Sequence, residues 1–325
     1  MIRYLLSRLG QGLMLVVVMS LLVFLGLFAI GNPVDILVNP QADQAEIEHT
    51  IAALGLDKPL WEQYATFVTK ALHGNLGDSF VHGISALNLI LTRLPATLEL
   101  AVVAMLIAIL LGIPLGLWAG LRPDSLAGRV IMGGSILGFS LPTFWVGLML
   151  IMMFSVQLQW LPASGRGSTV DLSGVPLSIA TADGWKHILL PALNLALFKL
   201  SLIVRLTRSG TREALTQDYV RFARAKGLSG PRIVGVHVLK NVLVPIVTVI
   251  GMEFGSLLAF SVVTESVFAW PGMGKLLIDS ITQLDRPVVV AYLMLVVVLY
   301  VTISFVTDVA YSILDPRVRL GGSAT

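Results

Sequence analysis

The chain of 325 residues contains no cysteine, and only 13% of its residues are charged. The missing cysteine excludes disulfides, thiolate chemistry, iron–sulfur clusters and cysteine-based zinc sites. A typical soluble globular chain carries about 25% charged residues, so the low charge argues against that class. Hydrophobic residues make up 56% of the chain, and its mean hydropathy is +0.86. These values indicate an integral membrane protein with several spans.

Sequence motifs for enzymatic chemistry are also missing. No Gly-x-x-x-x-Gly-Lys-Ser/Thr phosphate loop occurs, which excludes ATP hydrolysis by that route in this chain. No Ser-His-Asp or His-Glu-x-x-His arrangement is visible, so an intramembrane hydrolase is disfavoured. His73 and His82 could share an external metal, but positions in turns explain both more simply. We therefore expect no catalytic residue, no cofactor and no metal site in this chain.

The long apolar runs predict an all-α polytopic membrane fold with six transmembrane helices. The first run begins at Leu9 and is longer than the core of a secretory signal peptide, so we expect an uncleaved span. Leu141-Pro142 is expected to bend the third span. The predicted spans cover residues 9–30, 97–121, 130–156, 188–204, 242–263 and 288–313.

The segments between the spans complete the predicted organisation. An extracytoplasmic insert is expected to hold an amphipathic stretch after Asn39-Pro40 and a helix from Leu60 that His73-Gly74 ends. Residues 157–187 are predicted to form an external loop, and residues 264–287 an external segment that could make a re-entrant turn. The predicted regions are 1–30 (cytoplasmic N-terminus and first span), 31–95 (insert), 96–313 (transmembrane core, with a cytoplasmic loop at 205–241) and 314–325 (cytoplasmic tail).

The distribution of charge supports this topology. The predicted cytoplasmic segments hold 14 basic and 4 acidic residues, whereas the external segments hold 7 basic and 12 acidic residues. Cytoplasmic loops of membrane proteins carry the excess of Lys and Arg, so both termini are expected inside. The same distribution explains the basic pI of 9.3 without a nucleic-acid partner.

Some small and charged residues within the predicted spans have specific expectations. Gly112, Gly116 and Gly120 recur every four residues and predict a helix-packing seam, which Gly134 and Gly138 would repeat. Charges in spans usually face protein or a water-filled path. Glu253, with Ser256 three residues on, could therefore line a translocation path or make a hydrogen bond between helices. Lys199 is expected to be structural or to reach toward an interface.

The segment from Arg205 to Asn241 is the most distinctive part of the sequence. It holds 8 of the 22 basic residues and only two acidic residues, between two apolar runs. Good helix formers from Glu213 to Ala225 predict a helix that Gly227 ends. A turn at Ser229-Gly230-Pro231 would lead through a second short helix into the next span. An ordinary positively charged loop that only fixes topology is the simpler alternative.

The amino-acid sequence of this segment resembles a known family. Asp218-Tyr-Val-Arg-x-Ala-Arg-Ala-Lys-Gly-Leu228, with His237-x-Leu-x-Asn241, resembles the coupling-loop (EAA) motif of binding-protein-dependent ABC importers. The dipeptide/oligopeptide/nickel permease family is the most similar. Phe222 departs from the Thr expected at that position. Three further stretches are similar to the same family: residues 55–79, Glu265–Gly274 and Leu314–Arg317.

By this resemblance, the chain is one of two permease subunits of an ATP-driven importer in a bacterial inner membrane and forms half of the path for di- or oligopeptides. The resemblance implies a sister permease, an extracytoplasmic solute-binding protein, and two ATP-binding subunits that carry ATP and Mg. The alternative substrates are nickel and glutathione; a secondary transporter is the alternative from another class. The residues to which the resemblance gives an ATPase-coupling role are Asp218, Tyr219, Arg221, Ala223, Arg224, Ala225, Lys226, Gly227, Leu228 and His237.

Overall fold

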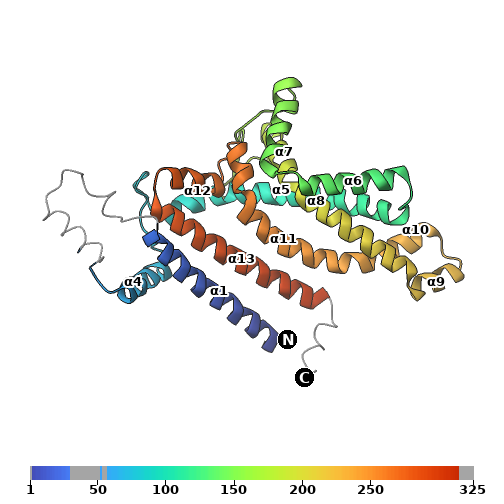
Figure 1. The fold of residues 1–325 in the computed structure, drawn as a ribbon, viewed down its shortest axis with the longest axis horizontal. Coiled ribbons are helices and arrows are strands. Elements are labelled where there is room, and N and C mark those ends of the chain that lie inside the picture. Colours follow the sequence, from blue (N-terminus) through green and yellow to red (C-terminus); the bar gives the residue numbers. More distant parts are fainter. Residues whose placement is uncertain (1, 30–51, 53–56, 315–325) are drawn as a thin grey trace. The chain divides into compact units, whose positions relative to one another are not determined.

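A computed structural model describes residues 2–29, 52 and 57–314, and confirms an all-α polytopic membrane fold (Figure 1). The predicted amphipathic stretch after Asn39-Pro40 and the tail from residue 315 lie outside the described residues. The elements, in order, are α1 (Ile2–Ala29), α4 (Leu60–Leu72), α5 (Ala86–Leu121), α6 (Leu126–Ser140), α7 (Thr143–Leu150), the π-helical turn η1 (Ile151–Gln157), β1 (Val170–Leu172), β2 (Val175–Leu177), α8 (Ala182–Thr216), α9 (Asp218–Ala225), α10 (Gly230–Arg232), the π-helical turn η2 (Ile233–Val238), α11 (Leu239–Val267), α12 (Met273–Thr282) and α13 (Arg286–Leu314).

Five of the described helices are long and apolar enough to cross a membrane. The predicted third span is not one straight helix, because α6 ends at Ser140 and the next helix starts at Thr143 with a bend of 110°. The bend expected at Leu141-Pro142 is thus confirmed, and the pair forms either a broken sixth span or a re-entrant loop. The five single spans are Leu6–Gly26, Ala86–Leu121, Ala182–Thr216, Pro245–Val267 and Arg286–Val309.

Several observed elements extend beyond or differ from the predicted segments. Helix α5 begins at Ala86 and contains Pro95, whereas the sequence placed Pro95 before the span. Helix α8 begins at Ala182 and continues to Thr216, well past the predicted end of the span at residue 204. The segment predicted as an irregular external loop contains an antiparallel hairpin of β1 and β2. The helix from Leu60 is confirmed, and it ends at His73 with Gly74 at a φ of +76°.

The described chain divides into two compact units, and residues 93–275 with 302–314 form the first. Here α8 packs against α6, α7 and α11 (Figure 1). The predicted glycine seam is confirmed on α5, because a Cβ at Gly116 would lie 2.6 Å from both Thr207 Cβ and the Val204 carbonyl oxygen. Gly138 continues the seam against Ser201, but Gly134 does not, since nothing lies within 4 Å of the position of its Cβ. Close backbone approach therefore joins α5 and α6 to α8.

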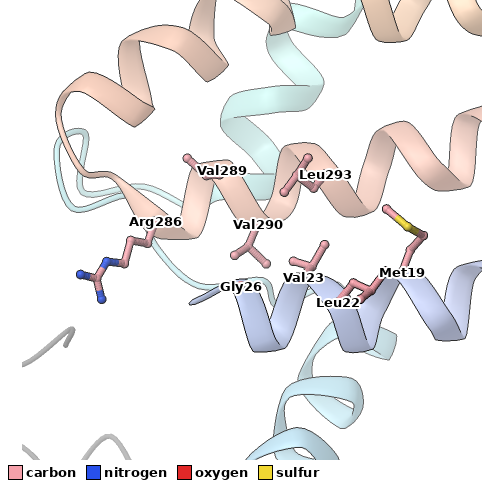
Figure 2. Close-up of a pocket in the computed structure, with 8 residues that line it drawn as sticks. All are labelled: Met19, Leu22, Val23, Gly26, Arg286, Val289, Val290 and Leu293. Carbon is pink, nitrogen blue, oxygen red and sulfur yellow. The ribbon is translucent and has the colours of Figure 1, made fainter. Parts of the chain in front are cut away.

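Residues 2–92 with 276–301 form the second unit. Helix α4 packs against α1 through a hydrogen bond of 2.8 Å between Ser20 Oγ and the Tyr64 hydroxyl, and through Phe24. A cavity of about 220 Å³ lies between α1 and α13. Figure 2 shows its mainly apolar lining, with Arg286 at one end. Such a lining suits packing within a membrane and offers little to a polar solute. The residues that line it are Met19, Leu22, Val23, Gly26, Arg286, Val289, Val290 and Leu293.

Candidate functional site

The segment between α8 and α11 forms a separate helical projection. The sequence predicted one helix from Glu213 to Ala225, and this is wrong: α8 ends at Thr216, and α9 starts at Asp218. Gln217 between them has an extended backbone, with ψ at 148°. Thr216 Oγ1 donates to the Glu213 carbonyl oxygen at 2.7 Å, a local bond that competes with the helix ladder. The break turns α9 into a short independent helix.

The end of α9 is a Schellman motif. The backbone N–H of Leu228 donates to the Ala223 carbonyl oxygen at 3.2 Å, and that of Gly227 donates to the Arg224 carbonyl oxygen at 2.9 Å. Gly227 has a φ of +75°, which glycine adopts without steric cost. The prediction that Gly227 ends this helix is therefore confirmed. Leu228 is half-buried and packs against the same apolar cluster as Ala223.

Helix α9 has a buried face and an exposed face. Val220 is fully buried and Ala223 is 4% exposed, and both pack with Ile233 and Val238 of η2 and with α11. Phe222 lies on the other face and is 63% exposed. Three small residues to which the resemblance gives a coupling role are therefore placed differently: Ala223 belongs to the chain's own core, whereas Ala225 and Gly227 are exposed.

The exposed face of α9 is basic and aromatic. Arg221 and Asp218 form a solvent-exposed ion pair at 3.5 Å, a type that contributes little stability. Lys226 Nζ lies 4.7 Å from the centre of the Phe222 ring. Tyr219 and Arg224 are exposed beside them, whereas His237 in η2 is half-buried. This face is held in place by the buried one, yet nothing on the described chain covers it.

Two charged residues within the spans, Lys199 and Glu253, come together between α8 and α11. Lys199 Nζ forms an ion pair with Glu253 and donates to Ser256 Oγ at 2.7 Å. Ser256 Oγ is also 3.0 Å from Glu253 Oε2. Side-chain exposure is 9% for Lys199 and 29% for Glu253. The hydrogen bond between helices considered for Glu253 is thus present, with Lys199 as its partner, and the path role remains a prediction.

Sequence reasoning missed a buried polar network around Glu265. This side chain is 0% exposed and accepts hydrogen bonds from Thr97 Oγ1 at 2.8 Å, Ser261 Oγ at 2.9 Å and the Lys275 N–H at 3.0 Å. A Cβ at Gly272 would lie 2.5 Å from Thr97 Oγ1. Hydrogen bonds to buried side chains therefore hold the segment from Glu265 to Gly274, which was predicted as an external turn, against the core. Its acidic residue followed by a glycine-rich stretch was the available signal.

A second missed network holds the external hairpin. Glu99 accepts hydrogen bonds from Arg166 at 2.7 Å, from Ser178 Oγ at 2.9 Å and from the Ile179 N–H at 2.7 Å. Arg166 also donates to the Pro176 carbonyl oxygen at 2.6 Å. These bonds fix both sides of the hairpin to α5. They give the buried carboxylate three partners and a compensating charge.

Metal ligation has little support in the part of the chain that the structure describes. No group of three or more His, Asp or Glu side chains is suitably placed there. His73 Nδ1 lies 2.7 Å from the Thr69 carbonyl oxygen, one helical turn back. His73 lies in the turn directly after α4, as the sequence predicted.

Comparisons with known proteins agree along nearly the whole chain. The di/tripeptide transport system permease protein DppB of Pseudomonas aeruginosa is 43% identical over 89% of this chain and 90% of its own. The dipeptide transport system permease protein DppB of Escherichia coli K12 is 39% identical over 98% of this chain and 99% of its own. The glutathione transport system permease protein GsiC of Escherichia coli O6:H1 is 36% identical over 98% of this chain and 99% of its own.

A solved structure and two family descriptions complete the comparison. An inward-facing structure of the MetNI methionine ABC transporter has a chain that is 17% identical, with a TM-score of 0.55, over 70% of this chain and 96% of that chain. At that identity, the likeness concerns the fold. Residues 1–101 match the N-terminal family of binding-protein-dependent transport system membrane components. Residues 112–320 match the main family. The chain belongs to the family of binding-protein-dependent transport system inner membrane components.

Proposed function

We propose that this chain is one of two permease subunits of an ATP-driven importer for di- or oligopeptides. The peptide substrate is supported by near-full-length similarity to permeases named for dipeptides and tripeptides. Glutathione is the second candidate, because a glutathione permease is 36% identical over 98% of the chain. Glutathione is itself a small peptide, so both candidates share one substrate class.

The proposed assembly contains a sister permease, an extracytoplasmic solute-binding protein and two ATPase subunits that bind ATP and Mg. The exposed face of α9 would dock on an ATPase subunit, with Phe222 as its apolar contact and the basic residues around it. Interfaces favour aromatic and Arg side chains of this kind. The exposed basic and aromatic face of α9 is the observation that supports the coupling role. The proposal gives the chain no ATPase activity of its own.

The proposed coupling depends on a stiff connection from α9 into the membrane. Helix α8 runs directly from its span to Thr216, and α11 continues from η2 on the other side of the loop. The buried residues of α9, η2 and α11 form one apolar cluster. A push on α9 would therefore move the ends of both spans together, whereas a flexible loop would dissipate it.

The proposed orientation places both termini and the loop at 205–241 in the cytoplasm. The excess of basic residues on that side supports this arrangement. The insert at 31–95 and the hairpin of β1 and β2 would then face outward. Glu253 and Ser256 would line the path between these two sides.

The test is substrate-stimulated ATP hydrolysis by the reconstituted complex, with the wild type compared with Gly227→Asp. We expect the variant to lose stimulated hydrolysis and transport by at least tenfold while the chain stays inserted. Gly174→Asp is the matched control, because Gly174 also has a positive φ (+85°) and open space at its Cβ, but lies in the external hairpin. Full transport by an assembled Gly227→Asp complex would contradict the coupling role of the loop.

A further inference from the structure

Lys199 is a buried charge that the coupling loop does not use. It lies at the midpoint of α8, and its side chain is more buried than that of its partner Glu253. A buried ion pair between two helices can often be replaced by apolar side chains without loss of stability. Packing of α8 against α11 therefore does not explain why a lysine stands here.

The Lys199–Glu253 pair is accessible from the side of Glu253. The carboxylate is 29% exposed although it lies inside the span Pro245–Val267. Ionisable side chains in spans seldom face lipid and usually face a water-filled cavity or another protein segment. The accessible side of the Lys199–Glu253 pair is therefore suited to contact with a polar solute inside the membrane.

We infer that Lys199 and Glu253 together bind the two ends of a small peptide during its passage, with the peptide carboxylate on Lys199 and its ammonium on Glu253. This inference rests on the proposed function and adds Lys199 as a specificity-determining residue. A peptide with free ends carries one charge of each sign, which matches the pair. Binding then exchanges one ion pair for two, and no buried charge loses its partner.

Ligands with a different charge pattern gain less from this site. A single cation would pair with Glu253 but leave the Lys199 ammonium without its carboxylate, and a single anion would do the reverse. An uncovered buried charge is strongly unfavourable. Two neighbours help to stabilise the charges while the ion pairs exchange. Ser256 Oγ lies 3.0 Å from Glu253 Oε2, and the Phe198 ring centre lies 5.2 Å from Lys199 Nζ. The pair thus favours zwitterions over bare metal ions.

The experiment measures Ala-Ala imported per ATP hydrolysed by the complete complex in vesicles, with its solute-binding protein saturated. The variants are Lys199→Met, Glu253→Gln and the double variant with both changes. We expect the ratio to fall at least tenfold in all three. The double variant contains no unpaired charge, so it also tests the inference if a single variant fails to assemble. Lys199→Arg keeps the charge, and we expect it to restore the ratio to within about threefold of wild type.

The control is a neutral polar pair on the same two helices. Asn194 Nδ2 donates to Thr264 Oγ1 at 3.0 Å, and the double variant Asn194→Leu with Thr264→Val should keep a near-wild-type ratio. Recovery of the ratio in the neutral double variant at 199 and 253 would mean that the pair is only structural, and would overturn the inference. Wild-type ratios in the single variants would do the same. A wild-type complex that imports no free peptide would instead refute the proposed function, before any variant is made.

A second measurement addresses the end that Lys199 binds. Ala-Ala and its C-terminal amide are compared at concentrations that saturate the solute-binding protein. We expect the wild-type complex to import the free peptide at least tenfold faster, and Lys199→Met to reduce this preference to about twofold or less. An unchanged preference in Lys199→Met would overturn the assignment of the carboxylate to Lys199.

Discussion

Two stretches with the same family resemblance have opposite relations to the core. The turn from Glu265 to Gly274 faces inward: Glu265 and Trp270 are both 0% exposed, and the Trp270 indole N–H donates to the Ala96 carbonyl oxygen at 2.9 Å. Helix α9 buries only Val220 and Ala223, and exposes Phe222 and a group of charges. The motif from Glu265 to Gly274 therefore stabilises the fold, whereas the motif on α9 leaves side chains exposed and available to a partner.

The difference also concerns the role of charge in each stretch. In the turn, the Glu265 carboxylate accepts hydrogen bonds from three donors, so its loss would remove an acceptor from each of them. On α9, the pair of Arg221 and Asp218 is surrounded by solvent and can be removed at little cost. Substitutions in the two stretches should therefore separate stability from partner binding.

The largest effect is expected at the turn. Glu265→Ala should lower the free energy of unfolding by about 3 kcal/mol or more, because two buried hydroxyl donors and one part-buried backbone N–H each lose a hydrogen bond to the carboxylate. The measurement is the thermal unfolding midpoint of the purified complex in detergent, together with the yield of assembled complex. Glu213→Ala is the control, since Glu213 is exposed on α8 and should change stability by about 0.5 kcal/mol or less. Equal unfolding midpoints for the two variants would contradict the claim that the turn from Glu265 to Gly274 stabilises the fold.

A pair of neighbouring substitutions tests the two faces of α9. Val220→Ala removes two buried methyl groups and should destabilise the protein by about 2 kcal/mol. Phe222→Ala removes a side chain that is 63% exposed, so stability should change by about 0.5 kcal/mol or less. Binding of the ATPase subunits, measured by co-purification and stimulated hydrolysis, should instead fall about tenfold or more in Phe222→Ala. The reverse pattern would show that the exposed face is not the partner surface.

The smallest effect on stability is expected at the exposed ion pair. Arg221→Ala should change the unfolding midpoint by less than about 1 °C, because an exposed pair at 3.5 Å contributes at most a few tenths of a kcal/mol. Any effect on ATPase association should grow at low ionic strength, where exposed charges are less screened. A clear loss of stability would mean that α9 depends on this pair for its fold.

Local signals predicted some of these features well. Gly227 ends α9 because its backbone has a φ of +75°, and a glycine after a run of helix formers indicates such a stop. The glycines on α5 predicted the seam because the four-residue spacing alone puts them on one helix face. Gly134 shares that spacing with Gly138 but has open space beside it, since spacing does not say which helix, if any, lies opposite.

Other features depend on partners that are distant in the sequence. Nothing next to Glu265 in the sequence indicates Thr97 as its donor, which lies 168 residues away. The pairing of Lys199 with Glu253 likewise joins two spans, although each charge was notable by itself. The break at Gln217 directly follows the hydrogen bond of the Thr216 side chain to the backbone. Helix propensities summed from Glu213 to Ala225 did not indicate this break. Propensity is a weak guide where a side chain competes for the backbone.

The unbroken course of α8 fixes a rotational phase between its middle and its end. Each residue of an α-helix turns the chain by about 100° and advances it by about 1.5 Å. One residue inserted between Lys199 and Thr216 would therefore rotate everything beyond it by roughly a quarter turn relative to the Lys199–Glu253 pair, and α9 could no longer bury Val220 in its present place. Changes close to whole turns would preserve the rotational phase, but each added turn would still move α9 by about 5.4 Å along the helix axis. The number of residues in this interval is thus as strictly constrained as their identity, and relatives that keep both features should align across it without a gap.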